Sequence, residues 1–279
     1  MRNNRANILI FVLWILVILS LFSIAISYNS AADIKLARYE SDSIKSLYLA
    51  KAGIAKMMAE LNKDKNNYTG LNGDWNKEKE FRFGGGKVVY SASDESARFN
   101  LNSPNLNKDH LIRLGLNEDV SLRLLDYKTG KEEKGFEFIE ELFLIDGVMR
   151  DIYLRIKDYV TIYRCTDSRI NINTAGENVL RIVLGDDSII NRIIEFRQGD
   201  DAESGTNDDG VFTEDNFSAV FKNFGVTPEA VLNYQALFSV KSDFFRVAAE
   251  ASFSEDKNQA RRVAAVMGRS GKIYYWKEE

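Results

Sequence analysis

The chain has 279 residues, of which 45% are hydrophobic and 28% are charged, and its formal charge is −4 at pH 7. This globular composition supplies enough apolar material for one or two cores. The single cysteine, Cys165, excludes an internal disulfide, and a single histidine, His110, argues against a Cys–His or Ser–His–Asp catalytic site. His110 lies in a polar, turn-like stretch and is predicted to be a solvated surface residue. Lys, Tyr or carboxylate catalysis is not excluded by these counts, but no paired-carboxylate motif stands out, and we expect no catalytic residues.

The N-terminus carries an apolar segment long enough to cross a bilayer. Residues 7–32 contain no charge, Gly or Pro, and 15 of the 19 residues from 8 to 26 are Ile, Leu, Val or Phe. A span needs about 20 residues, and each such side chain favours insertion by roughly 0.3–0.6 kcal/mol. Arg2 and Arg5 precede the segment, so the positive-inside rule places residues 1–6 in the cytosol and the body outside. A cleaved signal peptide is the alternative, but its apolar region is normally shorter.

The helical pattern continues beyond the span. Between residues 33 and 61 apolar residues recur at spacings of three and four, with charged residues on the opposite face. No Pro interrupts the pattern and Gly53 is its only glycine, so residues 7–61 are predicted to form one helix of about 80 Å. Half of it would lie in the membrane and half on a folded domain. The predicted packing stripe comprises Ile44, Leu47, Tyr48, Ile54, Met58 and Leu61.

Patterns of period two follow the helix and return at the C-terminus. Residues 80–90 alternate around the triple glycine 84–86, which predicts a β-hairpin. The glycines are not followed by the Lys-Ser/Thr and helix of a phosphate loop, so we interpret them as a turn. Further strands are predicted within 244–253, 261–267 and 273–276, and both ends of the body would contribute to one sheet.

The middle of the chain is predicted to be helical and contains an internal repeat. One copy begins at residues 98–103 and the other at 169–174, 71 residues later. The further matching segments are Leu114-Gly115 and Leu184-Gly185, 120–128 and 189–197, 138–142 and 212–217, Gly147-Val148 and Gly225-Val226, and 159–163 and 237–241.

The second copy also resembles the helix-hairpin-helix units of DNA-binding proteins. Residues 169–240 hold five basic and twelve acidic residues, a net charge of −7 that repels a polyanion. We therefore interpret the helix pair as a packing unit and expect no nucleic-acid partner.

Six blocks of sequence, taken in order, resemble one family over nearly the whole chain. The blocks are residues 5–14, 48–54, 94–102, 138–147, 170–175 and 240–245. Together they resemble the K-type minor pseudopilins of type II secretion systems, the GspK family.

This resemblance implies an α+β pseudopilin fold, in which a long N-terminal helix packs on an antiparallel sheet and a large, internally duplicated helical domain is inserted between strands. It implies a structural role in the periplasm, capping the pseudopilus and helping to initiate it. The partners would be the I- and J-type minor pseudopilins, the major pseudopilin and the inner membrane. The implied segments are a leader (1–6), a transmembrane part (7–32), the rest of the helix with the first strands (33–94), the inserted domain (95–241, with repeats at about 98–163 and 169–241) and the C-terminal strands (242–279).

The resemblance also implies processing by a prepilin peptidase, with methylation, between Ala6 and Asn7, where family members usually have Gly before the cut. Most of the superfamily has Glu at the fifth mature position, where it neutralises a neighbour's N-terminal ammonium. Here that residue is Phe11, as is usual for the K type. Because a buried unpaired ammonium costs several kcal/mol, such a subunit suits a cap with neighbours on one side.

Residues 199–210 interleave acids with Gly and Asn, which supplies hard oxygen ligands on a bending backbone. Characterised relatives bind calcium, so the resemblance supports calcium here, with Asp200, Asp201, Asp208 and Asp209 as predicted ligands. A solvated acidic loop is the alternative.

Three other classes of protein remain as alternatives: a type IV pilus minor pilin, a membrane-tethered helix-hairpin-helix DNA-binding protein and an anchored hydrolase. The duplicated insertion favours the secretion system over the pilus. The acidic second repeat argues against the DNA-binding protein, and no clustered catalytic set supports the hydrolase.

Overall fold

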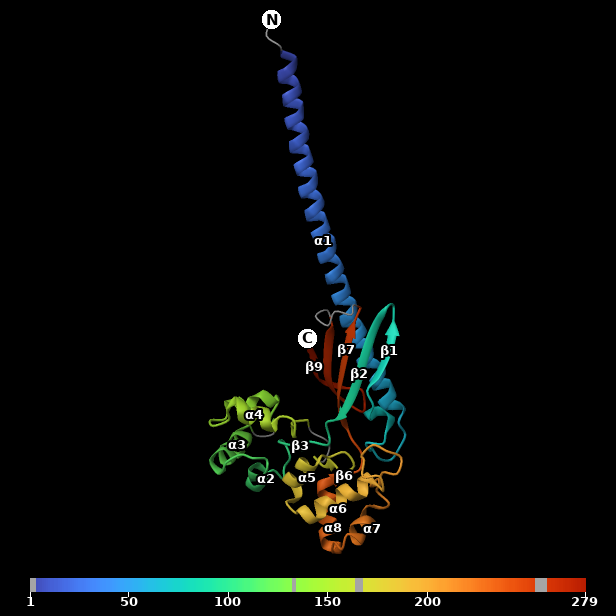
Figure 1. Cartoon of the computed structure of the whole chain (residues 1–279). Helices are drawn as coiled ribbons and strands as arrows, with labels where there is room; N and C mark the ends of the chain where they lie inside the picture. Colours follow the sequence, from blue (N-terminus) through green and yellow to red (C-terminus); the bar gives the residue numbers. More distant parts are fainter. Residues whose placement is uncertain (1–3, 132–133, 164–167, 254–259) are drawn as a thin grey trace.

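The computed structural model describes residues 4–131, 134–163, 168–253 and 260–279, with the backbone alone for residues 4–7. Arg2 and Cys165, used in the sequence predictions, lie outside these residues. Figure 1 shows three parts: a long helix with a free N-terminal half, a small sheet against its C-terminal half, and a helical domain at the end of the sheet far from the N-terminus.

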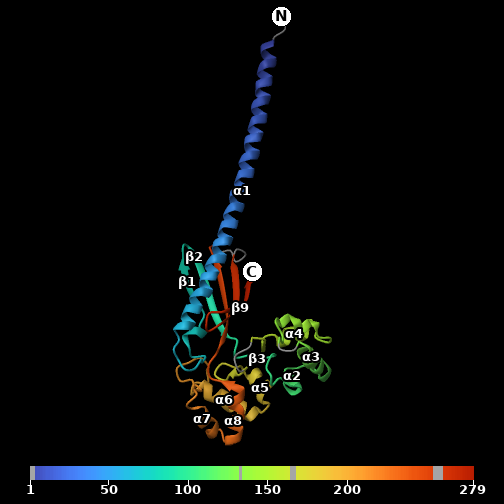
Figure 2. The same ribbon diagram turned by 180° about the vertical axis from the view of Figure 1, so that it is seen from behind.

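Helix α1 (Asn4–Lys63) is continuous over 60 residues, about 90 Å at 1.5 Å per residue. The predicted uninterrupted helix over residues 7–61 is confirmed, and it extends slightly further at both ends. Figure 2 shows its C-terminal half lying across one face of the sheet.

The predicted packing stripe of α1 is wrong in part. Ile44 and Tyr48 are 58% and 66% exposed, whereas the buried face is built around Ala50 and Gly53. A Cβ at Gly53 would lie 2.8 Å from the nearest atom of Val88, so only glycine allows this approach. These small residues lie among larger buried ones on the packing face, where the helix comes very close to the sheet. The buried apolar residues of α1 are Leu49, Ala50, Ile54, Met57 and Leu61.

The sheet has five antiparallel strands in the order β1-β2-β7-β8-β9. They are β1 (Lys79–Phe83), β2 (Gly86–Asp94), β7 (Phe244–Ser252), β8 (Arg261–Gly268) and β9 (Ile273–Glu278). A short 3-10 turn, η1 (Asp74–Asn76), precedes β1. The predicted hairpin is confirmed: Gly84 and Gly85 adopt positive φ and form its turn, which side chains rarely tolerate.

A large domain is inserted between two neighbouring strands of this sheet. β2 ends at Asp94, which pairs with Phe245 on β7, and residues 95–243 lie between the two strands in the chain. The inserted elements are β3 (Phe99–Asn100), α2 (Lys108–Arg113), α3 (Glu118–Gly130), η2 (Ile139–Leu144), α4 (Arg150–Ile156), β4 (Val160–Thr161), β5 (Ile170–Asn171), α5 (Glu177–Leu184), α6 (Asp187–Gln198), α7 (Phe217–Asn223), α8 (Pro228–Leu237) and β6 (Phe238–Ser239).

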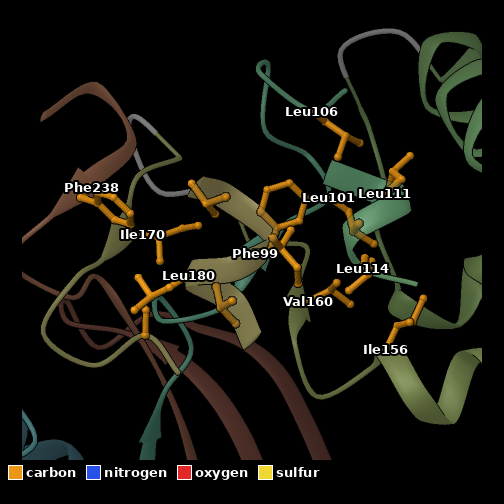
Figure 3. Packing of buried hydrophobic residues seen from close by; sticks show 14 of the residues in the cluster. Phe99, Leu101, Leu106, Leu111, Leu114, Ile156, Val160, Ile170, Leu180 and Phe238 are labelled. Atoms are coloured by element: carbon orange, nitrogen blue, oxygen red, sulfur yellow. The ribbon is translucent and has the colours of Figure 1, made fainter. Parts of the chain in front are cut away.

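The two sequence repeats correspond to two structural units with the same closure. In the first repeat β3 pairs in parallel with β4, and in the second β5 pairs in parallel with β6. Both units contribute to a single apolar core, in which Phe99 of the first and Ile170 and Leu180 of the second belong to one cluster (Figure 3). A separate core lies between α1 and the sheet.

Candidate functional site

The N-terminal half of α1 exposes an unbroken apolar surface. From Ile8 to Ile26 the large apolar side chains are 41–70% exposed. Within the described residues, α1 is the helix whose length and composition allow it to cross a membrane. A surface of this size is unstable in water and is suited to hydrocarbon.

The exposed apolar surface continues beyond the length that a bilayer covers. Ile34, Leu36, Tyr39, Ile44 and Tyr48 all remain exposed on the way to the sheet. The strip ends where Lys51 of α1 pairs with Glu278 of β9 at 2.8 Å. We call the five exposed side chains of Ile34, Leu36, Tyr39, Ile44 and Tyr48 the α1 strip. Its position between membrane and body makes it a candidate surface for contact with other protein helices.

The predicted processing residues lie at the start of the same helix. Ala6 and Asn7 belong to the first turns of α1, and the structure describes their backbone alone. Phe11 lies one turn further on and is exposed on the apolar surface. Nothing here tests cleavage, which therefore stays a prediction.

A buried asparagine organises the first repeat. The side-chain amide of Asn102 donates to the carbonyls of Phe136 at 2.9 Å and Ile162 at 2.7 Å, and its oxygen accepts the Phe136 N–H at 2.7 Å. One side chain thus joins three segments distant in sequence and satisfies their buried backbone groups.

The second repeat contains the same clip. Asn173 donates to the carbonyls of Phe212 at 2.8 Å and Val240 at 3.3 Å, and accepts the Phe212 N–H at 2.7 Å. The structural equivalent of Phe212 is therefore Phe136, and the sequence match of residues 138–142 with residues 212–217 is wrong by two positions. Sequence reasoning aligned the acids that follow, which do not occupy equivalent positions. The recurring Asn-x-Asn at residues 100–102 and 171–173 was the available signal for the clip.

The prediction that His110 is a solvated surface residue is wrong. Its side chain is only 9% exposed, and its ring packs at 5.1 Å from the ring of Phe99. Asn107, three residues earlier, is the N-cap of α2, so the polar stretch begins a helix rather than a turn. Burial lowers the pKa of His110, with a further contribution from Arg113.

The acidic loop 199–210 is closed by its own carboxylates. Asp208 Oδ2 accepts the backbone N–H of Asp200 at 2.9 Å and of Asp201 at 3.2 Å, and its Oδ1 accepts the Thr206 hydroxyl at 2.8 Å. The Thr206 hydroxyl and these backbone groups lower the pKa of Asp208 to about 2. Asp209 Oδ2 accepts the backbone N–H of Gly205 at 2.7 Å.

The four predicted calcium ligands are thus neighbours in one loop, but they do not form a preassembled metal site. In the parts of the chain that the structure describes, no three His, Cys, Asp or Glu side chains converge as metal ligands would. Arg197 also lies close enough to Asp209 for a favourable charge interaction. Its buried guanidinium donates to the Ala175 carbonyl at 2.6 Å, and burial lowers its pKa to about 10. Calcium binding therefore remains a prediction.

A second exposed apolar area lies on the first repeat. Four apolar residues are exposed there: Phe143 and Leu144 of η2, and Phe138 and Met149, which immediately precede η2 and α4. We call these four residues the first-repeat patch. An open cleft of about 230 Å³, lined in part by Phe138, lies between this repeat and Tyr274 and Tyr275 of edge strand β9.

Comparison with known proteins gives a match in structure. No family model matches the chain, and no curated protein matches its sequence. A chain in the crystal structure of the GspK-GspI-GspJ complex from the type 2 secretion system of enterotoxigenic Escherichia coli shares its fold, with a TM-score of 0.65 and 16% sequence identity. The match covers 87% of this chain and 99% of that chain. The predicted α+β pseudopilin fold is confirmed.

Proposed function

We propose that this chain is a K-type minor pseudopilin of a type II secretion system, a structural protein rather than an enzyme. Helix α1 would hold it in the inner membrane as a single span, with the sheet and inserted domain in the periplasm. There it would cap the pseudopilus and help to initiate it, in contact with I- and J-type minor pseudopilins and the major pseudopilin.

The observation that carries this proposal is the continuity of α1. One helix joins an apolar half suited to a bilayer, the exposed α1 strip and a half packed on the sheet. Lateral packing of such helices would bury the strip, which no part of the described chain covers. The shared fold with a chain of the GspK-GspI-GspJ complex, over 99% of that chain, supports the same assignment.

The test is co-purification from membranes. The tagged full-length chain is expressed with the I- and J-type minor pseudopilins of its own system, solubilised in mild detergent and captured. We expect the three proteins to elute together, and a variant with Ile44→Asp and Tyr48→Asp in the α1 strip to elute without them. Recovery of the mature chain in the soluble fraction without α1 would refute the proposal. A gel shift with DNA at modest salt would favour the DNA-binding alternative instead, and co-purification with type IV pilins would favour the pilus.

The identity of residue 11 gives a second test. A glutamate at residue 11 would neutralise the N-terminal ammonium of a neighbouring subunit inside the membrane, and Phe11 cannot do so. A subunit at the cap has no need of this neutralisation. Phe11→Glu should therefore permit placement away from the tip or impair initiation. Pseudopilus length in micrographs and secretion of a reporter measure this effect, with Phe11→Leu as the matched control. Unchanged length and secretion would count against the cap.

We also propose, from the resemblance, that prepilin peptidase cuts between Ala6 and Asn7 and that loop 199–210 takes calcium. Mass spectrometry of the N-terminus tests the first, with Ala6→Gly expected to be cut at least as well. A calcium titration, given below, tests the second.

A further inference from the structure

The body and the inserted domain have separate apolar cores, with a polar layer where the chain passes between them. One core lies between α1 and the sheet, and the other lies within the two repeats. The chain leaves the sheet after Asp94 and returns to it at Phe244. Buried polar side chains lie around these two crossings. We call these side chains the polar junction, and they belong to Thr69, Asp94, Glu95, Ser96, Thr161, Asn171, Thr174 and Ser242.

Asp94, the last residue of β2, reaches the second repeat. Its Oδ2 accepts the amide of Asn171 at 3.1 Å and the hydroxyls of Thr174 and Ser242, and its Oδ1 accepts the N–H of Ser96 at 2.8 Å. Asn171 and Thr174 belong to the second repeat, and Ser242 belongs to the returning chain. This carboxylate therefore ties the end of β2 to the second repeat and to the start of β7.

Glu95, the next residue, reaches the first repeat. Its Oε1 accepts the hydroxyl of Thr161 on β4 at 2.9 Å. Arg246 on β7 grips the same carboxylate with two hydrogen bonds of 2.9 and 3.1 Å, and Arg98 lies 3.6 Å away. Glu95 is almost fully buried, whereas the side chain of Arg246 is 33% exposed. The bidentate pair connects the acid that holds the first repeat to strand β7 of the sheet.

We propose that Asp94 and Glu95 form a two-armed clamp that fixes the angle between the inserted domain and the body, with one carboxylate holding each repeat. Asp94 ends β2 and Glu95 begins the bend that follows it, and the two carboxylates accept hydrogen bonds from different repeats. A single attachment would allow the domain to rock about it, whereas two attachments prevent that rotation. The clamp does not depend on the proposed function.

The second repeat has further attachments to the body, since the Thr69 N–H donates to the Val240 carbonyl at 2.9 Å and the Asn171 amide donates to the Thr69 carbonyl at 2.9 Å. Loss of the Asp94 arm should therefore loosen the domain less than loss of the Glu95 arm, beside which the contacts are between rings. The rings of Phe244, Tyr163 and Tyr274 contact one another, at centroid distances of 5.0 to 6.2 Å. Ring contacts of this kind are broad in geometry and set an angle less sharply than hydrogen bonds to a buried carboxylate.

The experiment measures distances between the body and each repeat in the full-length chain in detergent, by electron–electron double resonance. Spin labels are placed at exposed positions through Lys63→Cys with either Asp126→Cys or Glu195→Cys, in a Cys165→Ser background. Glu95→Gln and Asp94→Asn each remove one arm and keep the shape of the side chain. Glu60→Gln is the matched control, since Glu60 binds Lys79 and Tyr90 within the body.

We expect Glu95→Gln to broaden the distance distribution to the first repeat more than that to the second, and Asp94→Asn to do the reverse. The control should broaden neither distribution. Equal broadening of both distributions by both variants, or none by either, would overturn the clamp. If a variant does not fold, Thr161→Val and Thr174→Val remove one donor from each arm and are judged by the same criterion.

Discussion

The two repeats are built on the same asparagine clip and present different surfaces to solvent. The first has a net charge of −2 over residues 98–163, from ten basic and twelve acidic residues, and carries the first-repeat patch. The second has a net charge of −7 over residues 169–240, and Leu232 is its one exposed large apolar residue in the described part of the chain. Buried amides that satisfy distant backbone groups constrain both copies in the same way. Surface residues have no such constraint, so charge and apolar exposure diverged.

The repeats also differ in how they attach to the body. Asn171 of the second repeat donates to the carbonyl of Thr69, to Asp94 and to Ser242. Asn100, its equivalent, donates at 2.8 Å to the carbonyl of Tyr163, inside its own repeat. The same residue type therefore serves closure of the unit in one copy and docking to the body in the other.

The largest effect should come from exchanging these two asparagines for alanine. Asn171→Ala removes hydrogen bonds to four buried partners, namely the Thr69 carbonyl, Asp94, Ser242 and the Asn173 N–H. Asn100→Ala removes bonds to two, the Tyr163 carbonyl and the Asn102 N–H, so we expect Asn171→Ala to cost about 2 kcal/mol more in free energy of unfolding. Denaturant unfolding of the full-length chain in detergent measures the difference. Equal costs would show that the contacts of Asn171 with the body contribute no stability beyond what Asn100 contributes within its own repeat.

A smaller effect on the free energy of unfolding is expected from replacing His110 of the first repeat by valine, the residue found at the matching position of the second repeat. Counted from the helix N-cap, His110 of α2 occupies the position of Val179 of α5. His110 Nδ1 is buried and has no hydrogen-bond partner among the described residues, so His110→Val should stabilise the chain by about 1 kcal/mol.

The pH dependence of this variant sharpens the test. The pKa of His110 is lower in the folded state than its value of about 6.5 in the unfolded chain. The free energy of unfolding is therefore undiminished by this group above pH 6.5, and it decreases as the pH falls from there through the folded-state pKa. Melting temperatures between pH 8 and pH 5 should fall less for His110→Val than for the parent. Parallel curves would mean that the histidine is not desolvated.

The smallest effect concerns calcium, which only the second repeat is predicted to bind. Calcium added to chelator-treated full-length chain should raise its melting temperature slightly and give heat in calorimetry. Asp208→Asn should reduce both signals, because this side chain is both a predicted ligand and the closure of the loop. Asp126→Asn, an exposed acid on the first repeat, serves as the control. An unmoved melting curve in the parent would remove the calcium site.

The sequence allowed the long helix, the hairpin, the C-terminal strands and the repeat to be predicted, because each depends on a local period or on self-similarity. It misled at Ile44 and Tyr48, where large apolar residues suggested burial. The actual packing face follows from the close approach of Gly53 to the sheet, which no local pattern reports.

The candidate site was predictable in its apolar part and not in its polar part. A run of apolar residues marks a membrane segment without reference to any other part of the chain. The asparagine clip and the pair Asp94–Glu95 acquire their roles only from partners 34 to 151 residues away. His110 shows the same limit, since its polar neighbours cap a helix whose far face is buried.

The pairing of Asp94 with Phe245 has a consequence for how this architecture arose. The inserted domain departs from and returns to the same spot on the sheet, where a tight turn would also serve. An insertion at this point requires no change in the strand order or in the face on which α1 lies. Changes in the size of the inserted domain are therefore compatible with an unchanged packing of helix α1 on the sheet.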